Sequence, residues 1–153
     1  MSQNQCGIAT AYGNIWMNTN NWTGKTYSLT TSYTEMTSLG TNFTLMTPNV
    51  DFAMSTDGRL KYTGTDTLNF IANACINGDT HSASKAVAIY KNGSLITGAE
   101  NYGTSISNDY SFPVVDVPVS LATNDYLSVW LKGSISSAAL VIYQVSLSAK
   151  SIL

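Results

Sequence analysis

The sequence predicts one all-β domain, a jelly-roll β-sandwich of two antiparallel sheets with about ten strands. Three observations support this fold class. Apolar and polar residues alternate with period two in most segments. Turn residues separate these segments at short intervals, and no stretch shows helical periodicity. An immunoglobulin-like sandwich is the alternative, but the expected strands exceed seven and no Cys-Trp-Cys spacing supports it.

The composition fits a folded domain that is poor in charge. The chain has 153 residues, the size of one domain, and it can bury a core without a disulfide or a metal. Charged residues make up 10%, against about 25% in a typical domain. The net charge is −2 and the seven Lys and Arg are scattered, so no nucleic-acid partner is expected. A surface with so little charge suits a protein that is largely covered by partners.

The N-terminal segment indicates where the chain is made. MSQNQCGIAT lacks the basic and apolar regions of a signal peptide. No apolar run reaches the roughly 18 residues that a membrane helix needs, so no membrane partner is expected. Cys6 and Cys75 are therefore expected to be free thiols in a reducing cytoplasm. Cys75 lies in an apolar strand pattern and is interpreted as a small core residue.

The first half of the chain offers several strands. Shorter candidates are residues 12–17, 25–29, 33–39 and 59–63. In residues 68–76, alternate positions form one apolar face. This face consists of Leu68, Phe70, Ala72, Ala74 and Ile76. Asn77-Gly78-Asp79 is expected to close that strand, and Asn92-Gly93 predicts a tight hairpin between residues 86–91 and 95–96.

The second half predicts strands at residues 105–112, 115–121, 126–132 and 139–147. The last two carry large apolar groups on both faces. In the first, Tyr126 and Trp130 lie on the face opposite Leu127. In the second, Leu140 and Ile142 lie on the face opposite Val141, Tyr143 and Val145. A sandwich strand in a monomer buries one face and leaves the other in water. The second face must then be covered by a loop or by another subunit. We expect a subunit interface at Tyr126 and Trp130, or at Leu140 and Ile142.

Few residues are suited to catalysis. The single histidine, His81, lies in a polar turn, where a solvated side chain is expected rather than a catalytic base. No His/Cys pair has metal-ligand spacing. A carboxylate pair for glycoside hydrolysis, or a calcium site at Asp109 and Asp125, stays an alternative to simple turn capping. We expect no enzyme activity, no metal and no cofactor.

Aromatic residues in the early segment provide a second possible type of site. Trp16, Trp22 and Tyr27 fall close together in sequence, and exposed rings can stack on sugars. Burial in the core or in an interface is the preferred interpretation. Glycan stacking by Trp16, Trp22 and Tyr27 is the alternative.

Several segments resemble a known family. The matching pieces are AYGNIWM, DGRLKYTGTDTLNFIANA, AVAIYKNGSLI, LATNDYLSVWLKG and ALVIYQVSLSAKSI. Their order is similar to the tumour-necrosis-factor/complement-type jelly-roll module of tailed-phage structural proteins, over residues 11–153. The chain departs from the usual pattern in residues 23–50 and at Pro113 and Pro118. The resemblance implies a homotrimer on a virus particle, with the last strands along the three-fold axis and no catalytic residues.

Two roles are compatible with this resemblance. We expect a non-enzymatic decoration or cement protein that binds and stabilises an assembled capsid, made in the host cytoplasm and placed on the virion surface. The receptor- or glycan-binding tip of a tail or head fibre is the alternative. Residues 1–10 are expected to form an arm ahead of the 11–153 domain. Gln3, Asn4 and Gln5 in this arm would pair with the major capsid protein as an added strand.

Overall fold

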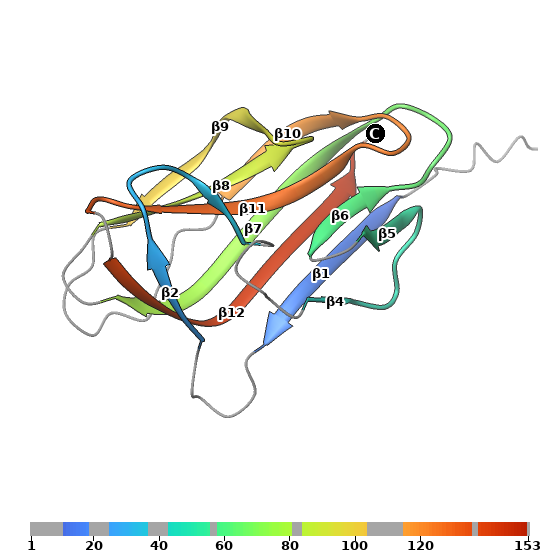
Figure 1. The fold of residues 1–153 in the computed structure, drawn as a ribbon. Coiled ribbons are helices and arrows are strands. Elements are labelled where there is room, and N and C mark those ends of the chain that lie inside the picture. The colour runs from blue at the N-terminus through green and yellow to red at the C-terminus, as the bar shows by residue number, and fades with distance from the viewer. Residues whose placement is uncertain are drawn as a thin grey trace, which may run out of the picture.

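The computed structural model describes residues 11–18, 25–36, 43–55, 58–80, 84–103, 115–135 and 138–152. These residues contain twelve strands, which confirms the predicted fold class (Figure 1). In chain order the strands are β1 (Tyr12–Asn18), β2 (Lys25–Leu29), β3 (Thr34–Glu35), β4 (Thr44–Leu45), β5 (Phe52–Ser55), β6 (Arg59–Tyr62), β7 (Leu68–Thr80), β8 (Lys85–Lys91), β9 (Ser94–Gly103), β10 (Val115–Leu121), β11 (Tyr126–Gly133) and β12 (Ala138–Ser151). The expected strand at residues 105–112 lies outside the described residues.

The strands form two six-stranded antiparallel sheets. The first sheet has the order β10-β7-β12-β1-β4, and β2 also pairs with β12. The second sheet has the order β5-β6-β11-β8-β9, and β3 pairs with β11. Figure 1 shows the sheets as two layers, with β7 and β12 as the long strands of one layer. Most neighbours are distant in sequence, as expected for a jelly roll.

The core lies between the two sheets and follows the predicted alternation. In β10, every odd-numbered residue from Val115 to Leu121 is buried, and Phe70 and Ala72 are buried in β7. An aromatic group occupies one part of this core. Phe70 and Tyr62 have ring centroids 5.1 Å apart, and Phe52 lies 5.3–5.4 Å from both. Edge-to-face contacts of this kind add to the stability gained from burial.

β12 departs from strict alternation because it contains a β-bulge. The register against β7 shifts between Ile142 and Gln144, which leaves Tyr143 as the inserted residue. Leu140 and Ile142 point into the core before the bulge, and Val145 points into the core after it. The expectation that Val141, Tyr143 and Val145 share one face is therefore wrong. The bulge also explains why this segment is apolar at both even and odd positions.

Turn predictions are confirmed in one place and wrong in another. Asn92 and Gly93 have φ values of 50° and 77°, and they connect β8 to β9 in a tight hairpin, as predicted. The segment Asn77-Gly78-Asp79 does not close β7. It continues the strand because these residues pair with the first half of β12.

Strand direction gives the molecule two distinct ends. The β8–β9 and β10–β11 turns lie at the end where the domain begins and finishes. There, Ser151 N donates to Ala11 O at 2.9 Å, and Ala11 N donates to Ser151 Oγ at 3.0 Å. We call this the termini end. β7, β9 and β11 run from it toward the opposite end, and β8, β10 and β12 return.

Candidate functional site

The outer face of the first sheet presents rows of side chains that are aligned across its strands. One row runs from Asn14 through Ser148 and Asn73 to Asp116, and the next joins Trp16 to Ser146. Further rows follow the same register. We call the following outward residues the polar face: Tyr12, Asn14, Trp16, Thr44, Ile71, Asn73, Cys75, Asp116, Pro118, Gln144, Ser146, Ser148 and Lys150.

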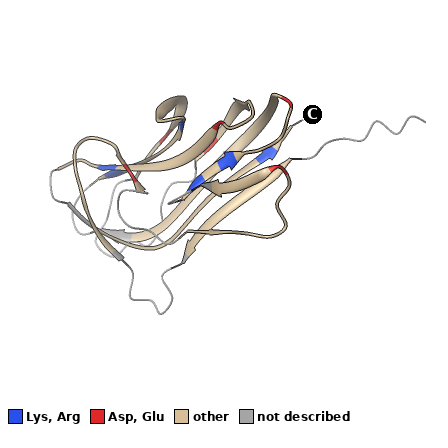
Figure 2. Ribbon diagram, turned by 45° about the vertical axis from the view of Figure 1, so that its right-hand side comes forward, with Lys and Arg blue, Asp and Glu red and all other residues tan. Residues whose placement is uncertain are grey.

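Charge is sparse on the polar face. Lys150 and Asp116 are its charged members, and Asn73 Nδ2 donates to Asp116 Oδ1 at 2.8 Å. Hydroxyl, amide and ring groups fill most of the remaining positions. Figure 2 shows that most of the described ribbon carries neither acidic nor basic residues. A flat sheet with these groups offers hydrogen-bond donors and acceptors without charge repulsion between copies.

Exposed apolar side chains gather at the termini end of the same face. Val50 is 49% exposed, Ile71 37% and Ile152 45%. Val50 pairs with Tyr12, and Tyr12 lies in the same row as Lys150 and Ile71. Tyr12 and Lys150 lie between Val50 and Ile71 in this row, so this end of the face mixes exposed apolar groups with polar ones, as contact surfaces do.

Two polar atoms on this face are buried without a partner. Asn14 Oδ1 and Trp16 Nε1 have no hydrogen bond to any described residue. Both residues point outward from β1 and lie two positions apart. A buried polar atom without a partner costs free energy, so this part of the face carries a local cost.

Cys75 also lies on the polar face and not in the core. Its neighbours Ala74 and Ile76 are the buried residues of β7, and Cys75 is half-buried opposite Ser146. The expectation of a core cysteine is thus wrong, because the confirmed alternation of β7 turns odd positions outward. It is a free thiol in the structure.

The second sheet has a different outer face, built from stacked rings. Tyr90 on β8 stacks on Trp130 on β11, with centroids 4.2 Å apart and planes 14° apart. Tyr33 meets Tyr90 edge-on at 5.8 Å. Lys132 Nζ lies 4.1 Å from the Tyr33 ring centre and 5.1 Å from that of Tyr102. We call these five residues the aromatic platform.

Ion pairs and cation–π contacts border the aromatic platform. Arg59 donates to both carboxylate oxygens of Glu35 at 2.9 and 2.8 Å, and its guanidinium lies 4.7 Å from the ring centre of Tyr126. Lys132 Nζ lies 3.8 Å from Glu100 Oε1. Burial, and next the carboxylate of Glu100, raise the pKa of Tyr33 above its usual range. The large groups on this face thus contact one another within one chain.

The expected interface residues separate into two groups. Leu140 and Ile142 are 0% exposed and face the core, so the structure corrects the expectation that they contact another subunit. Their outward placement assumed the alternation that the bulge breaks. Tyr126 and Trp130 do point outward from β11, and both are half-buried by neighbours in the same chain. A subunit contact at Tyr126 and Trp130 stays an untested alternative to one on the polar face.

The other candidate residues are also dispersed. Tyr27 is buried in the core, where its hydroxyl lies 4.0 Å from Met17 Sδ and burial raises its pKa to about 12. Trp16 points outward from the first sheet, so Tyr27 and Trp16 form no common stacking surface. The third member of the predicted aromatic cluster, Trp22, lies outside the described residues, as do Gln3, Asn4, Gln5, His81 and Asp109.

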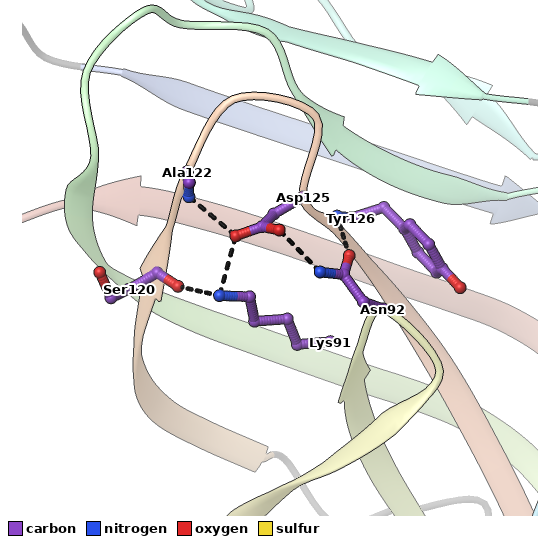
Figure 3. A network of polar contacts seen from close by, with 6 residues as sticks. All are labelled: Lys91, Asn92, Ser120, Ala122, Asp125 and Tyr126. Atoms are coloured by element: carbon purple, nitrogen blue, oxygen red, sulfur yellow. Dashed lines mark hydrogen bonds and ion pairs between the residues drawn. The ribbon is translucent and has the colours of Figure 1, made fainter.

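Asp125 ties together two turns at the termini end. Its Oδ2 accepts from Ala122 N at 2.8 Å and lies 2.8 Å from Lys91 Nζ, and its Oδ1 accepts from Asn92 Nδ2 at 2.6 Å (Figure 3). Asn92 Oδ1 in turn accepts from Tyr126 N at 2.9 Å. Burial alone would raise the pKa of Asp125, but the contacts from Lys91, Ala122 and Asn92 hold it below its usual range. The predicted turn-capping role is confirmed.

Sequence reasoning missed the aromatic platform. Tyr33 lies just before β3, Tyr90 and Tyr102 lie on the hairpin strands β8 and β9, and only the strand order brings these two elements together across β11. One signal was present in residues 86–90, where Ala86 and Ala88 alternate with the buried Val87 and Ile89. Two small residues on the outward side of a central strand leave room for large neighbours to lie over them.

Neither a metal centre nor a membrane helix is found in the described part of the chain. Its His, Cys, Asp and Glu residues form no group of three or more that could hold a metal ion. No described helix has the length and hydropathy to cross a membrane.

Comparison with known proteins identifies the fold but not a sequence family. No family model and no curated protein matches the sequence. PRD1 vertex protein P5 superposes with a TM-score of 0.66 at 12% identity, covering 94% of this chain and 97% of that chain. Eiger TNF from S. frugiperda gives 0.58 at 9% identity over 94% of both chains, and murine APRIL gives 0.53 at 10% identity over 94% and 99%. The chain therefore has the TNF-type jelly-roll fold, shared by a vertex protein and by cytokine-like proteins.

Proposed function

We propose that the protein is a non-enzymatic structural protein of a virus particle, a homotrimer that decorates an assembled capsid and stabilises it. The observation that carries this proposal is the polar face, a flat and nearly uncharged sheet surface with exposed apolar residues at one end. The likeness to a vertex protein over nearly its whole length supports the placement on a particle. Three copies are the number that the resemblance to TNF-type jelly rolls implies.

The polar face is the surface that we assign to contact between subunits. Ile71 and Val50 gain from burial there, at roughly 25 cal/mol for each Å² of apolar area removed from water. The aromatic platform is the weaker candidate for this contact, because its rings and Lys132 already contact one another within the chain.

The termini end is the part that we assign to the capsid. Ala11, where the arm of residues 1–10 joins the domain, lies beside Ser151 at this end. The contacts of Asp125 brace two turns at the same end, which favours a rigid base. A protein that binds only the assembled shell stabilises it by its binding free energy, without catalysis. Each attachment needs about 800 Å² of buried surface on each partner, the standard size.

The trimer is tested by light scattering during size-exclusion chromatography at micromolar concentration. We expect wild type and Ile135→Asp to be trimers and Ile71→Asp to be a monomer, because Ile135 is 54% exposed and lies away from the polar face. Trp130→Asp is expected to stay a trimer. If wild type is a monomer, the trimer proposal is wrong. If Trp130→Asp is the one variant that dissociates, the interface lies on the second sheet instead.

Capsid attachment is tested with shells assembled without the protein. We expect the full chain to bind them and raise their disruption temperature on heating. A trimer that lacks residues 2–10 is expected to bind more weakly, because the arm would add a strand to a capsid subunit. Equal binding by the truncated trimer removes the anchoring role of Gln3, Asn4 and Gln5. If the full chain leaves shells unchanged but coats host cells, the fibre-tip alternative is correct.

A further inference from the structure

We propose that the aromatic platform is a binding site for a glycan, and that the unit in contact is an N-acetylhexosamine. The site lies on the outer face of the second sheet, on the other side of the sandwich from the polar face. It uses none of Trp16, Trp22 and Tyr27. It would give the protein a ligand on the side turned away from its own copies, and it does not depend on the proposed capsid role.

The rings of the platform lie over the sheet rather than projecting from it. Ala88 and Ser128 point outward, since their chain neighbours Val87, Ile89, Leu127 and Val129 fill the core, yet both are fully buried. In the register, Trp130 lies opposite Ala88 and Tyr90 opposite Ser128. Trp130 Nε1 donates to Ser128 Oγ at 2.9 Å, which draws the indole down onto the strand. The rings therefore cover the small residues beneath them.

Flat, fixed rings are suited to a pyranose. One face of a hexopyranose carries several C–H groups, and these are weakly positive, whereas the face of an aromatic ring is negative. The stacking of Trp130 on Tyr90 and the contacts of Lys132 hold the rings in place before any ligand arrives. Little conformational entropy is then lost on binding. Tyr102 is the most accessible ring of the platform, with 62% of its surface exposed.

Hydrogen-bond donors and acceptors, which sugar hydroxyls require, lie at the edge of the platform. Lys132 Nζ lies 3.3 Å from Tyr102 Oη and 3.8 Å from Glu100 Oε1, so an ammonium, a phenol and a carboxylate meet beside one ring. Tyr102 Oη also lies 3.5 Å from Glu100 Oε1. Vicinal hydroxyls of a sugar both donate and accept, and this group offers both kinds of partner within a few ångströms.

A small cavity beside Tyr102 indicates the acetamido group. It measures about 80 Å³ and is lined by Ser84, Lys85, Ala86, Tyr102, Lys132, Gly133 and Ser134. A water needs roughly 10–15 Å³ in this measure, so the cavity is large enough for an acetamido group. Its lining is largely apolar, which suits the methyl of an acetamido group. Ser134 N donates to Ser84 O at 2.8 Å, which keeps the cavity open in a fixed shape.

Other classes of partner fit the platform less well. A nucleic acid would also stack on rings, but it needs a cationic groove. Here Lys132 and Arg59 are matched by Glu100 and Glu35. A protein partner gains mainly from covering apolar surface, and the platform rings already cover one another. The nucleic-acid class is an outcome that the experiment separates.

The test is a titration of the full-length protein, followed by tryptophan fluorescence and calorimetry. Chitotetraose is the N-acetylated probe, maltotetraose the non-acetylated one, and a 20-residue oligothymidine the nucleic-acid probe. We expect chitotetraose to bind and the other two to bind at least about tenfold more weakly. Tyr102→Ala should weaken chitotetraose binding at least about tenfold, since one stacking ring is lost. Tyr102→Phe, which keeps the ring but removes the phenol, should weaken binding less than Tyr102→Ala does.

Tyr126→Ala is the matched control. Tyr126 is on the same face of the same sheet, but its ring lies by Arg59 at the termini end. This variant should bind chitotetraose as wild type does. The proposed site is overturned if wild type does not bind chitotetraose, or if Tyr126→Ala loses as much binding as Tyr102→Ala. It is also overturned if Tyr102→Ala binds chitotetraose as tightly as wild type. Equal binding of maltotetraose overturns the acetamido assignment, and preferred binding of oligothymidine overturns the glycan. Shell binding is measured separately, so its failure leaves this result intact.

Discussion

A few polar side chains hold the two turns at the termini end in place. Asp125 receives three contacts from two turns, and Asn92 extends them to Tyr126. Asn92 and Asn124 have positive φ values of 50° and 74°, which Asn tolerates better than most residues. The two turns therefore owe their shape to a carboxylate and two amides rather than to apolar packing.

Removing the Asp125 carboxylate should destabilise the protein in a pH-dependent way. The folded pKa of Asp125 is lowered, so its contribution is present above the unfolded pKa and is lost as pH falls through the folded pKa. We expect Asp125→Ala to lower the free energy of unfolding by about 1–2 kcal/mol at pH 7. The difference from wild type should shrink toward pH 2. Urea unfolding at several pH values measures this, with Asp66→Ala, on an exposed turn, expected within about 0.5 kcal/mol of wild type.

Gly13 shows how closely β1 approaches the aromatic core. A Cβ at this position would lie 2.4 Å from Phe52 Cγ, far inside contact distance. We expect Gly13→Ala to lower the free energy of unfolding by about 1–3 kcal/mol, because the Phe52 ring is held by Tyr62 and Phe70. Adding Phe52→Ala removes the clash, so the double variant should be less destabilised than the sum of the single ones. Strict additivity in thermal unfolding would contradict this packing.

At the scale of strands, one bulge decides which residues are available to partners. Tyr143 is inserted in β12, and the strand changes its inward positions from even to odd there. β12 is bordered by β7 along most of its length, and on its other side by β2 and then β1. The bulge lies where the neighbour changes from β2 to β1. A local increase in twist there allows one long strand to serve two partners.

The bulge predicts opposite outcomes for adjacent residues. Leu140→Ala should lower the free energy of unfolding by about 2–5 kcal/mol, because Leu140 is fully buried between the sheets. Val141→Ala should cost less than about 1 kcal/mol in the monomer, because Val141 is half-buried and faces outward. Chemical denaturation of both variants measures the difference. Equal costs would mean that the faces of this segment are not as described.

The whole molecule divides its surface among three proposed uses. The polar face lies on the first sheet, the aromatic platform on the second, and the termini end joins them. The low charge of the chain as a whole reduces repulsion between copies. This division assigns assembly, ligand and attachment to separate surfaces, so each can be altered without the others.

Assembly through the polar face should make stability depend on concentration. A trimer gains folding free energy by mass action, so its thermal midpoint rises as the protein becomes more concentrated. We expect the thermal midpoint of wild type to rise as the protein concentration is raised from about 1 to about 100 μM. The thermal midpoint of Ile71→Asp should stay constant over the same range. Differential scanning calorimetry at several concentrations measures this. A constant midpoint for wild type would argue against a folding-coupled trimer.

The sequence by itself determined the fold class and most of the strands. Alternation is a local property, so residues 68–76 and 115–121 reveal their inward faces without any knowledge of neighbours. The hairpin at Asn92-Gly93 and the capping by Asp125 follow from short-range chemistry in the same way. The motif order between residues 11 and 153 also indicated the jelly roll that the structural comparison confirms.

Only the tertiary structure decided which side chains form surfaces. The bulge at Tyr143 depends on how β7, β1 and β2 meet β12, and a sequence pattern with a fixed period cannot express it. Leu140 and Ile142 were therefore expected at an interface although they fill the core. The aromatic platform needs Tyr33, Tyr90, Tyr102 and Trp130 to become neighbours across three strand pairings. Contacts of such long range are set by strand order, which local residue preferences do not encode.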